Sequence, residues 1–187
     1  MVKLNNTNIG LLGGSFDPAH KGHLTISKIA LKKFKLKKIY WIIAKKNPFK
    51  NKTFFSLKER IFQAKKITKK MKNIEVVYLD DLVKSSRSIK TIEYILKHKK
   101  PKILYFIVGS DILMKFHKWQ SWKKIVKLTK LIVFSRKGYD KNSKKTIVVK
   151  YLNKKNIVFV KNKPIQISST LLKKIWETHL MQISKIK

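Results

Sequence analysis

The chain has 187 residues, of which 43% are hydrophobic and 11% aromatic, and this composition indicates one packed α/β domain over residues 1–187 rather than a disordered chain. It contains no cysteine, which excludes a disulfide framework and thiol chemistry. No apolar run approaches the roughly 20 residues of a membrane span, and the N-terminus lacks the apolar core of a signal peptide. We therefore expect a cytoplasmic protein with no membrane partner.

The chain is strongly basic, with 46 Lys and Arg against 9 Asp and Glu and a net charge of +37. Clustered basic residues bind nucleic acid by releasing counterions, so a selected nucleic-acid surface is one interpretation. The basic residues are nearly all lysines, are spread over every predicted helix and accompany much Asn and Ile, as an AT-rich coding sequence would produce. We favour this compositional interpretation and expect no obligatory nucleic-acid partner, although the charge can attract nucleotide phosphates.

Strand and helix signals alternate along the whole chain. Apolar runs predict strands at 9–12, 38–43, 74–78, 103–108, 131–134 and 157–160. Helical spacing predicts helices at 24–34, 56–70, 88–98, 112–116, 120–128 and 169–179, and favours a helix at the ambiguous 144–152. Residues 138–145 are predicted to be a polar loop. The alternation predicts a Rossmann-like, doubly wound, mostly parallel sheet of about six strands with helices on both faces, and ligands at the carboxyl ends of the strands.

The first chemical motif follows the first predicted strand, where residues 13–23 read Gly-Gly-Ser-Phe-Asp-Pro-Ala-His-Lys-Gly-His. Gly13 and Gly14 let backbone N–H groups approach a phosphate, and the helix that follows adds the positive end of its dipole. His20 and His23 lie three residues apart on one side of the first helical turn. Their N–H groups can donate to phosphate oxygens, so the motif predicts a phosphate site.

The motif differs from the common phosphate-binding loops. No Gly-Lys-Ser/Thr follows at the spacing of a Walker loop, and the third glycine of a dinucleotide fingerprint is missing. Two incidental histidines beside a glycine turn remain an alternative. A metal site is disfavoured because the chain has no cysteine and no third clustered ligand follows.

Residues 13–23 resemble the signature of the nucleotidyltransferase superfamily, and most closely that of bacterial nicotinate-nucleotide adenylyltransferases. The resemblance implies transfer of AMP from Mg-ATP to nicotinate mononucleotide, which forms deamido-NAD and pyrophosphate in NAD biosynthesis. It implies that ATP is bound by Gly13, Gly14, Ser15, Phe16, His20, His23, Gly109, Asp111, Ile167, Ser168, Ser169 and Thr170. It implies that nicotinate mononucleotide is bound by Asn47, Lys50, Ser88, Thr91, Trp119 and Arg136.

A second motif opens the last predicted helix, where Ile167-Ser168-Ser169-Thr170-Leu171-Leu172-Lys173 resembles the family pattern Ile-Ser-Ser-Thr-x-x-Arg. Hydroxyl and N–H groups at a helix start suit the ATP phosphates. Lys173 stands where the family has arginine and keeps the charge without the bidentate fork, and Lys174 is an alternative for the same role. Both motifs are expected at the same edge of the sheet. By the resemblance His20, His23, Lys50 and Lys173 are the catalytic residues, with Mg²⁺ arriving on ATP and no metal ligand in the protein.

Shorter motifs between the two fit the same family. Asn47-Pro48-Phe49-Lys50 resembles its Asn-Pro-x-Lys turn, and Gly109-Ser110-Asp111 its Gly-x-Asp, although Asp111 also fits the N-cap of a helix. Trp119 is expected to stack on the nicotinate ring, while Trp122 is expected in the core. Arg136 resembles the family's Arg-x-Gly-Tyr turn, where a structural role is also open.

Residues 86–92 depart from the family's Ser-Tyr-Thr-x-Asp-Thr-Leu. Ser88 and Thr91 keep the hydroxyl pattern, and Ser88 is also a plausible N-cap. Arg87 and Lys90 replace Tyr and Asp, and we hypothesise that their charge favours nicotinate over nicotinamide mononucleotide.

Two alternatives in function stay open at this point. One is another small-molecule nucleotidyltransferase, resembling pantetheine-phosphate adenylyltransferases or cytidylyltransferases. The other is a basic RNA-binding protein on an inactive scaffold. The sequence does not decide between a monomer and a homo-oligomer.

Overall fold

Six strands, all parallel, form one sheet in the computed structural model, which describes residues 7–45, 52–162 and 167–184. The strands lie in the order β3-β2-β1-β4-β5-β6. They are β1 (Asn8–Gly14), β2 (Leu36–Ile43), β3 (Ile74–Val77), β4 (Ile103–Gly109), β5 (Lys130–Phe134) and β6 (Ile157–Val160). The predicted doubly wound α/β fold is confirmed, and each predicted strand is present within two residues of its expected ends.

The helices follow the strands in the predicted alternation. They are α1 (Lys21–Lys33), α2 (Leu57–Thr68), α3 (Ser88–Lys99), α4 (Ser110–Leu113), the 3₁₀ helix η1 (Phe116–Lys118), α5 (Trp122–Leu128), α6 (Asp140–Ser143), α7 (Ile147–Leu152) and α8 (Ser169–Ser184). The single helix predicted at 112–116 is wrong, because the chain forms α4 and η1 there instead. The expected polar loop at 138–145 contains α6, and the ambiguous segment before β6 is helical, as favoured.

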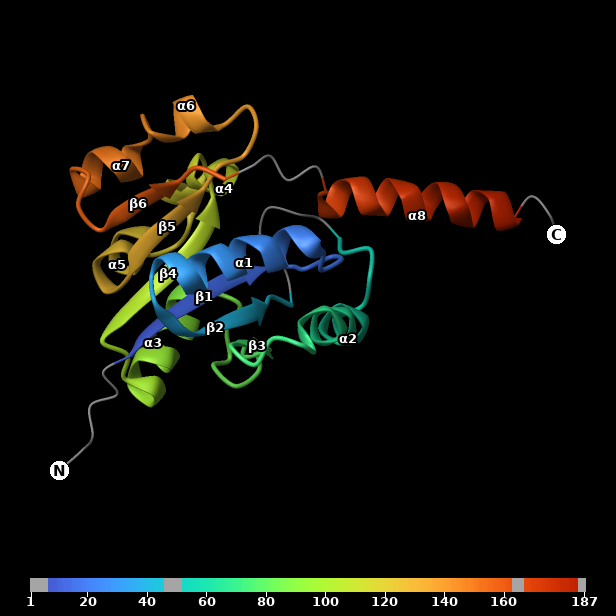
Figure 1. The fold of residues 1–187 in the computed structure, drawn as a ribbon, viewed down its shortest axis with the longest axis horizontal. Helices are drawn as coiled ribbons and strands as arrows, with labels where there is room; N and C mark the ends of the chain where they lie inside the picture. The colour runs from blue at the N-terminus through green and yellow to red at the C-terminus, as the bar shows by residue number, and fades with distance from the viewer. Residues whose placement is uncertain (1–6, 46–51, 163–166, 185–187) are drawn as a thin grey trace.

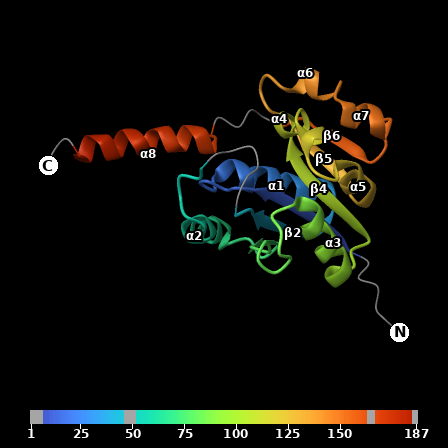
Figure 2. The same cartoon turned by 180° about the vertical axis from the view of Figure 1, so that it is seen from behind.

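Helices cover both faces of the sheet (Figures 1 and 2). Leu11 and Leu12, adjacent on β1, belong to different buried clusters because successive side chains of a strand point to opposite faces. The Leu12 cluster packs against α1 and α2, and the Leu11 cluster packs against α3, α5 and α7. Burial on both faces explains why the central strands are almost continuously apolar.

The order of the strands reverses between β1 and β4. From β1 the chain adds β2 and β3 on one side, and from β4 it adds β5 and β6 on the other. In such sheets ligands bind beyond the carboxyl ends of the strands at this reversal. The loop after β1 leads to α1, and Figure 1 shows α8 beginning near the start of α1 and pointing away from the sheet. In the described part of the chain, no helix combines the length and the apolar character needed to cross a membrane.

Candidate active site

The glycine pair closes β1. Gly13 and Gly14 pair with Ile42 and Ile43 of β2, so the strand runs two residues further than predicted. A Cβ added at Gly13 would come no closer than 3.8 Å to Phe106, and the residue is exposed. Core packing therefore does not require glycine at this position, and the absence of a side chain leaves the exposed backbone open to close approach by a ligand.

Phe16, two residues after the pair, has a backbone φ of 46° and a buried side chain. Its ring lies 4.7 Å from that of His23 and 5.0 Å from that of Trp41, between ring centroids. The side chain of Phe16 thus belongs to the core, which leaves its backbone as the part that can face a nucleotide. Ser15 is also buried.

His20 and His23 form the N-terminal cap of α1. The backbone N–H of Gly22 donates to His20 Nδ1 at 3.1 Å, and the backbone N–H of His20 donates to His23 Nδ1 at 3.2 Å. In a neutral imidazole whose Nδ1 accepts, the proton is on Nε2. The two ring centroids are 3.9 Å apart. The cap therefore fixes both rings side by side in the tautomer whose Nε2–H is a donor.

The environment of His20 keeps this ring neutral. The side chain is 4% exposed. Burial lowers the pKa of His20 to about 4, and the charge of Arg136 acts in the same direction. At neutral pH His20 is consequently a hydrogen-bond donor without a charge of its own.

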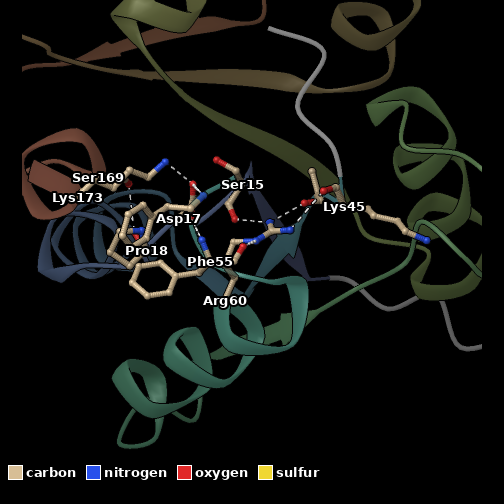
Figure 3. Close-up of polar contacts among 10 residues, drawn as sticks. Ser15, Asp17, Pro18, Lys45, Phe55, Arg60, Ser169 and Lys173 are labelled. Carbon is tan, nitrogen blue, oxygen red and sulfur yellow. Dashed lines mark hydrogen bonds and ion pairs between the residues drawn. The ribbon is translucent and has the colours of Figure 1, made fainter. Parts of the chain in front are cut away.

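The start of α8 contacts the first motif (Figure 3). Ser169 Oγ donates to the carbonyl of Pro18 at 3.0 Å, and Lys173 forms an ion pair with Asp17. Ser168 Oγ accepts from the N–H of Leu171 at 3.2 Å and so caps the helix. The two motifs lie at the two ends of the sequence, and the fold brings them together at one edge of the sheet.

Asp17 is the buried centre of this contact. Its carboxylate is fully buried and accepts the backbone N–H groups of Phe54 and Phe55 at 3.0 and 2.9 Å. Burial opposes ionisation of Asp17, but the hydrogen bond with Lys173 and the two N–H groups outweigh it and hold its pKa below the usual value. Asp17 thus joins the first motif to α8 and to the segment before α2.

Asp111 offers an acceptor at the end of β4. The N-cap position of α4 is Gly109, and Asp111 lies inside the helix and does not cap it. Its Oδ1 atom is buried and makes no hydrogen bond within the described chain, with Arg136 Nε 3.6 Å away. A Cβ on Gly109 would collide with this carboxylate oxygen, so glycine makes room for it.

The residues expected at the second substrate are placed in part. Asn47 and Lys50 lie outside the described residues. The N-cap position of α3 is Arg87, so the expectation that Ser88 caps this helix is wrong by one residue. Thr91 is buried, and the ring of Trp119 stacks on Phe116 with centroids 4.9 Å apart.

A cavity of about 380 Å³ lies beyond the ends of β2 and β3. Its lining combines charged side chains that follow the two strands with the turn that leads into α3: Lys45, Asp80, Asp81, Lys84, Ser85 and Ser86. It adjoins the turn into α3, whose first residue is Ser88.

Comparison with known proteins decides the family. A family model described as cytidylyltransferase-like matches residues 11–175. A protein of Pelagibacter ubique (strain HTCC1062), named a probable nicotinate-nucleotide adenylyltransferase, is 49% identical over 181 residues, which are 94% of this chain and 100% of the relative. This chain belongs to the nicotinate-nucleotide adenylyltransferase family.

Further adenylyltransferases support the assignment. A probable nicotinate-nucleotide adenylyltransferase of Helicobacter pylori (strain ATCC 700392 / 26695) is 36% identical over 141 residues, covering 73% of this chain and 79% of the relative. The structure of Plasmodium falciparum nicotinic acid mononucleotide adenylyltransferase complexed with NaAD superposes with a TM-score of 0.69 at 20% identity. The superposition covers 90% of this chain and 83% of that one, and shows that the fold is shared.

Two buried charged residues beside the candidate site have no role predicted from the sequence. Asp17 lies within the first motif without a task of its own there, and Arg60 of α2 belongs to no motif. Arg60 donates to backbone carbonyls, and every residue has such a carbonyl, so the sequence does not identify the partners. One signal was available, because only three of the 46 basic residues are arginine, and the fork of arginine is seldom replaceable by lysine.

The described residues contain no group of three His, Asp or Glu side chains placed to hold a metal ion.

Proposed function

We propose that this protein transfers AMP from Mg-ATP to nicotinate mononucleotide, forming deamido-NAD and pyrophosphate. The observation that carries the proposal is the contact between the two phosphate motifs, made by Ser169 with Pro18 and by Lys173 with Asp17. The names of the relatives support the choice of substrates, since the Pelagibacter ubique protein matches this chain over its whole length.

In the proposed reaction an oxygen of the 5′-phosphate of nicotinate mononucleotide attacks the α-phosphorus of ATP. The bond from that phosphorus to the bridging oxygen of the β-phosphate breaks, and pyrophosphate leaves in line with the attack. No side chain of the protein forms a covalent bond, so the site acts by alignment and by stabilising charge. Mg²⁺ enters as part of Mg-ATP and shields the phosphate charges.

Each motif has a distinct task. The Nε2–H groups of His20 and His23 donate to non-bridging oxygens of the reacting phosphates. The N–H groups and hydroxyls of residues 168–170 hold the β,γ end at the start of α8. Lys173 adds positive charge there; one of its three N–H bonds is used by Asp17, and its side chain remains 19% exposed. Lys50 has the matching task at the mononucleotide phosphate.

The second substrate is proposed to lie on the side of α3. Asn47, Ser88 and Trp119 bind it. On the ATP side, Asp111 accepts a hydrogen bond from a ribose hydroxyl through Oδ1, which forms an ion pair with Arg136 Nε at 3.6 Å but makes no hydrogen bond within the described chain. Arg87 is exposed at the start of α3, while Lys90 forms an ion pair with Glu93 at 3.4 Å. Arg87 is therefore the better candidate to attract the nicotinate carboxylate.

Release of pyrophosphate from Mg-ATP with a panel of acceptors tests the proposal. We expect release with nicotinate mononucleotide, slower release with nicotinamide mononucleotide, and none with phosphopantetheine. Replacing ATP by CTP with a phosphorylated alcohol tests the cytidylyltransferase alternative. Release of pyrophosphate only with one of these other substrates would contradict the proposed reaction and would assign the protein a different nucleotidyltransferase activity. No release with any of them, together with salt-dependent binding to RNA, would favour an inactive scaffold that binds RNA.

A further inference from the structure

Arg60 of α2 is the most deeply buried cationic side chain described in the chain. It is 1% exposed, among the largest fully buried side chains. None of its hydrogen bonds goes to a carboxylate within the described residues; Asp17 and Asp80 favour its charged form only from a distance. A buried guanidinium costs free energy to desolvate, so its hydrogen bonds must compensate for much of that cost.

Arg60 directs its donors to backbone carbonyls of separate segments. Nη1 donates to the carbonyl of Ser15 at 2.7 Å and to that of Ala44 at 2.8 Å. Nη2 donates to the carbonyl of Lys45 at 3.3 Å, and Nε donates to that of Phe55 at 3.2 Å. Figure 3 shows the guanidinium between the loop after β1 and the end of β2.

These segments carry the two halves of the proposed site. Ser15 lies in the phosphate motif that follows β1. Lys45 directly precedes residues 46–51 in the sequence, which contain the Asn47–Lys50 motif proposed to bind the mononucleotide. Phe55 is held twice, because Asp17 accepts its N–H and Arg60 donates to its carbonyl. One rigid fork therefore sets the spacing between the ATP side and the acceptor side.

Lysine cannot make the same set of contacts. A planar guanidinium presents five N–H donors in fixed directions, whereas an ammonium is a single point with three. The chain uses lysine at nearly every other basic position, which makes the arginine at 60 informative. We propose that Arg60 is a positioning residue that fixes the phosphate loop against the start of the mononucleotide-binding segment and so aligns the two substrates for in-line attack. The proposal rests on the proposed function.

The test compares Arg60→Lys and Arg60→Gln with two controls on α2. Ala64 lies one helical turn after Arg60 and is fully buried, and it takes no part in these hydrogen bonds. We therefore expect Ala64→Gly to lower Tm by about 2–4 °C without moving the loops. Lys65→Met removes an exposed charge from the same helix. Initial rates are measured at 20 °C, where each variant is shown by circular dichroism to be folded, over full concentration ranges of both substrates.

We expect Arg60→Lys to lower kcat by about 10- to 100-fold, the effect of misplacing reacting groups by a fraction of an ångström to 1 Å, while each KM changes by less than about threefold. Ala64→Gly and Lys65→Met should keep the wild-type kcat. A kcat for both Arg60 variants equal to that of Ala64→Gly would overturn the proposal. So would failure of both to fold, since Arg60 would then act in folding.

The activity of the wild-type protein distinguishes a failure of the proposed function from a failure of the proposal for Arg60. If wild-type protein releases pyrophosphate with no acceptor of the panel, the proposed function fails. If it is active with some acceptor, the comparison between Arg60→Lys and Ala64→Gly is made with that acceptor, and decides the role of Arg60 independently.

Discussion

Replacing Lys173 by methionine removes the cation that faces Asp17 and keeps a side chain of similar length. Asp17 is fully buried, and it would retain only the backbone N–H groups of Phe54 and Phe55. Removing one partner of a buried ion pair lowers the free energy of unfolding by about 3–5 kcal/mol. Because two hydrogen bonds to the carboxylate remain, we expect the lower end, about 3 kcal/mol, which for a chain of this size lowers Tm by about 6–12 °C.

The difference in stability between wild type and Lys173→Met is expected to depend on pH. The folded-state pKa of Asp17 is held below its ordinary value of 3.8, so the stability that ionised Asp17 contributes is present above that pH and is lost as the pH falls through the folded-state pKa. Urea unfolding at pH 7 and at pH 3, followed by tryptophan fluorescence, should show a difference in unfolding free energy between wild type and Lys173→Met that is smaller at pH 3, below the ordinary pKa of 3.8. Lys174→Met, an exposed neighbour, is the control. Equal stability of the two variants at pH 7 would refute the reasoning.

Four further outcomes are expected. His20→Ala should lower kcat by about 10²–10³ with the fold intact, against an unchanged rate for the exposed His98→Ala; a drop below tenfold would contradict the donor role. Nitrogen NMR should show the His20 ring neutral down to about pH 4, and the stability it contributes should decline as the pH falls from 6.5 towards 4, because the unfolded state then binds more protons. Gly109→Ala should raise the KM for ATP several-fold by displacing the Asp111 carboxylate; an unchanged KM would remove Asp111 from the ribose. Arg87→Gln should reduce the preference for nicotinate over nicotinamide mononucleotide in kcat/KM by about two- to fivefold, as expected for an exposed charge. The same preference in wild type and Arg87→Gln would exclude a role of Arg87 in choosing between the two substrates.

The fold was predictable because its signals are local. A strand apolar on both faces, as at β4, predicts a central position in a parallel sheet. The helix expected at 56–70 has Ser56 and Glu59 at the spacing of a capping box, and that capping box is present at the start of α2. The short elements α4, η1 and α6 were misjudged, since segments of three or four residues carry too little periodicity to identify. That the whole chain forms a single domain stays a prediction.

Residues of the candidate site could be proposed from the sequence only where they lie close together in it. His20 and His23 lie at the cap and in the first turn of α1, and Ser168 and Ser169 lie at the start of α8, so spacing in the sequence was enough to propose each group. Asp17 binds backbone groups of Phe54 and Phe55, and Arg60 binds carbonyls from three segments. Such contacts join a side chain to backbone groups that are distant in the sequence. Because any residue type can supply those backbone groups, no pattern of residue types predicts the contacts.

The transfer of radioactive label from ATP carrying ³²P at the α-phosphate to nicotinate mononucleotide tests the central claim most directly. Wild-type protein should place the label in deamido-NAD. Because His20 and Lys173 act on one triphosphate, the loss of rate in the double variant His20→Ala/Lys173→Met should be smaller than the product of the two single losses. Label that stays in ATP, or losses that multiply as for independent sites, would contradict a single cleft formed by the first motif and α8.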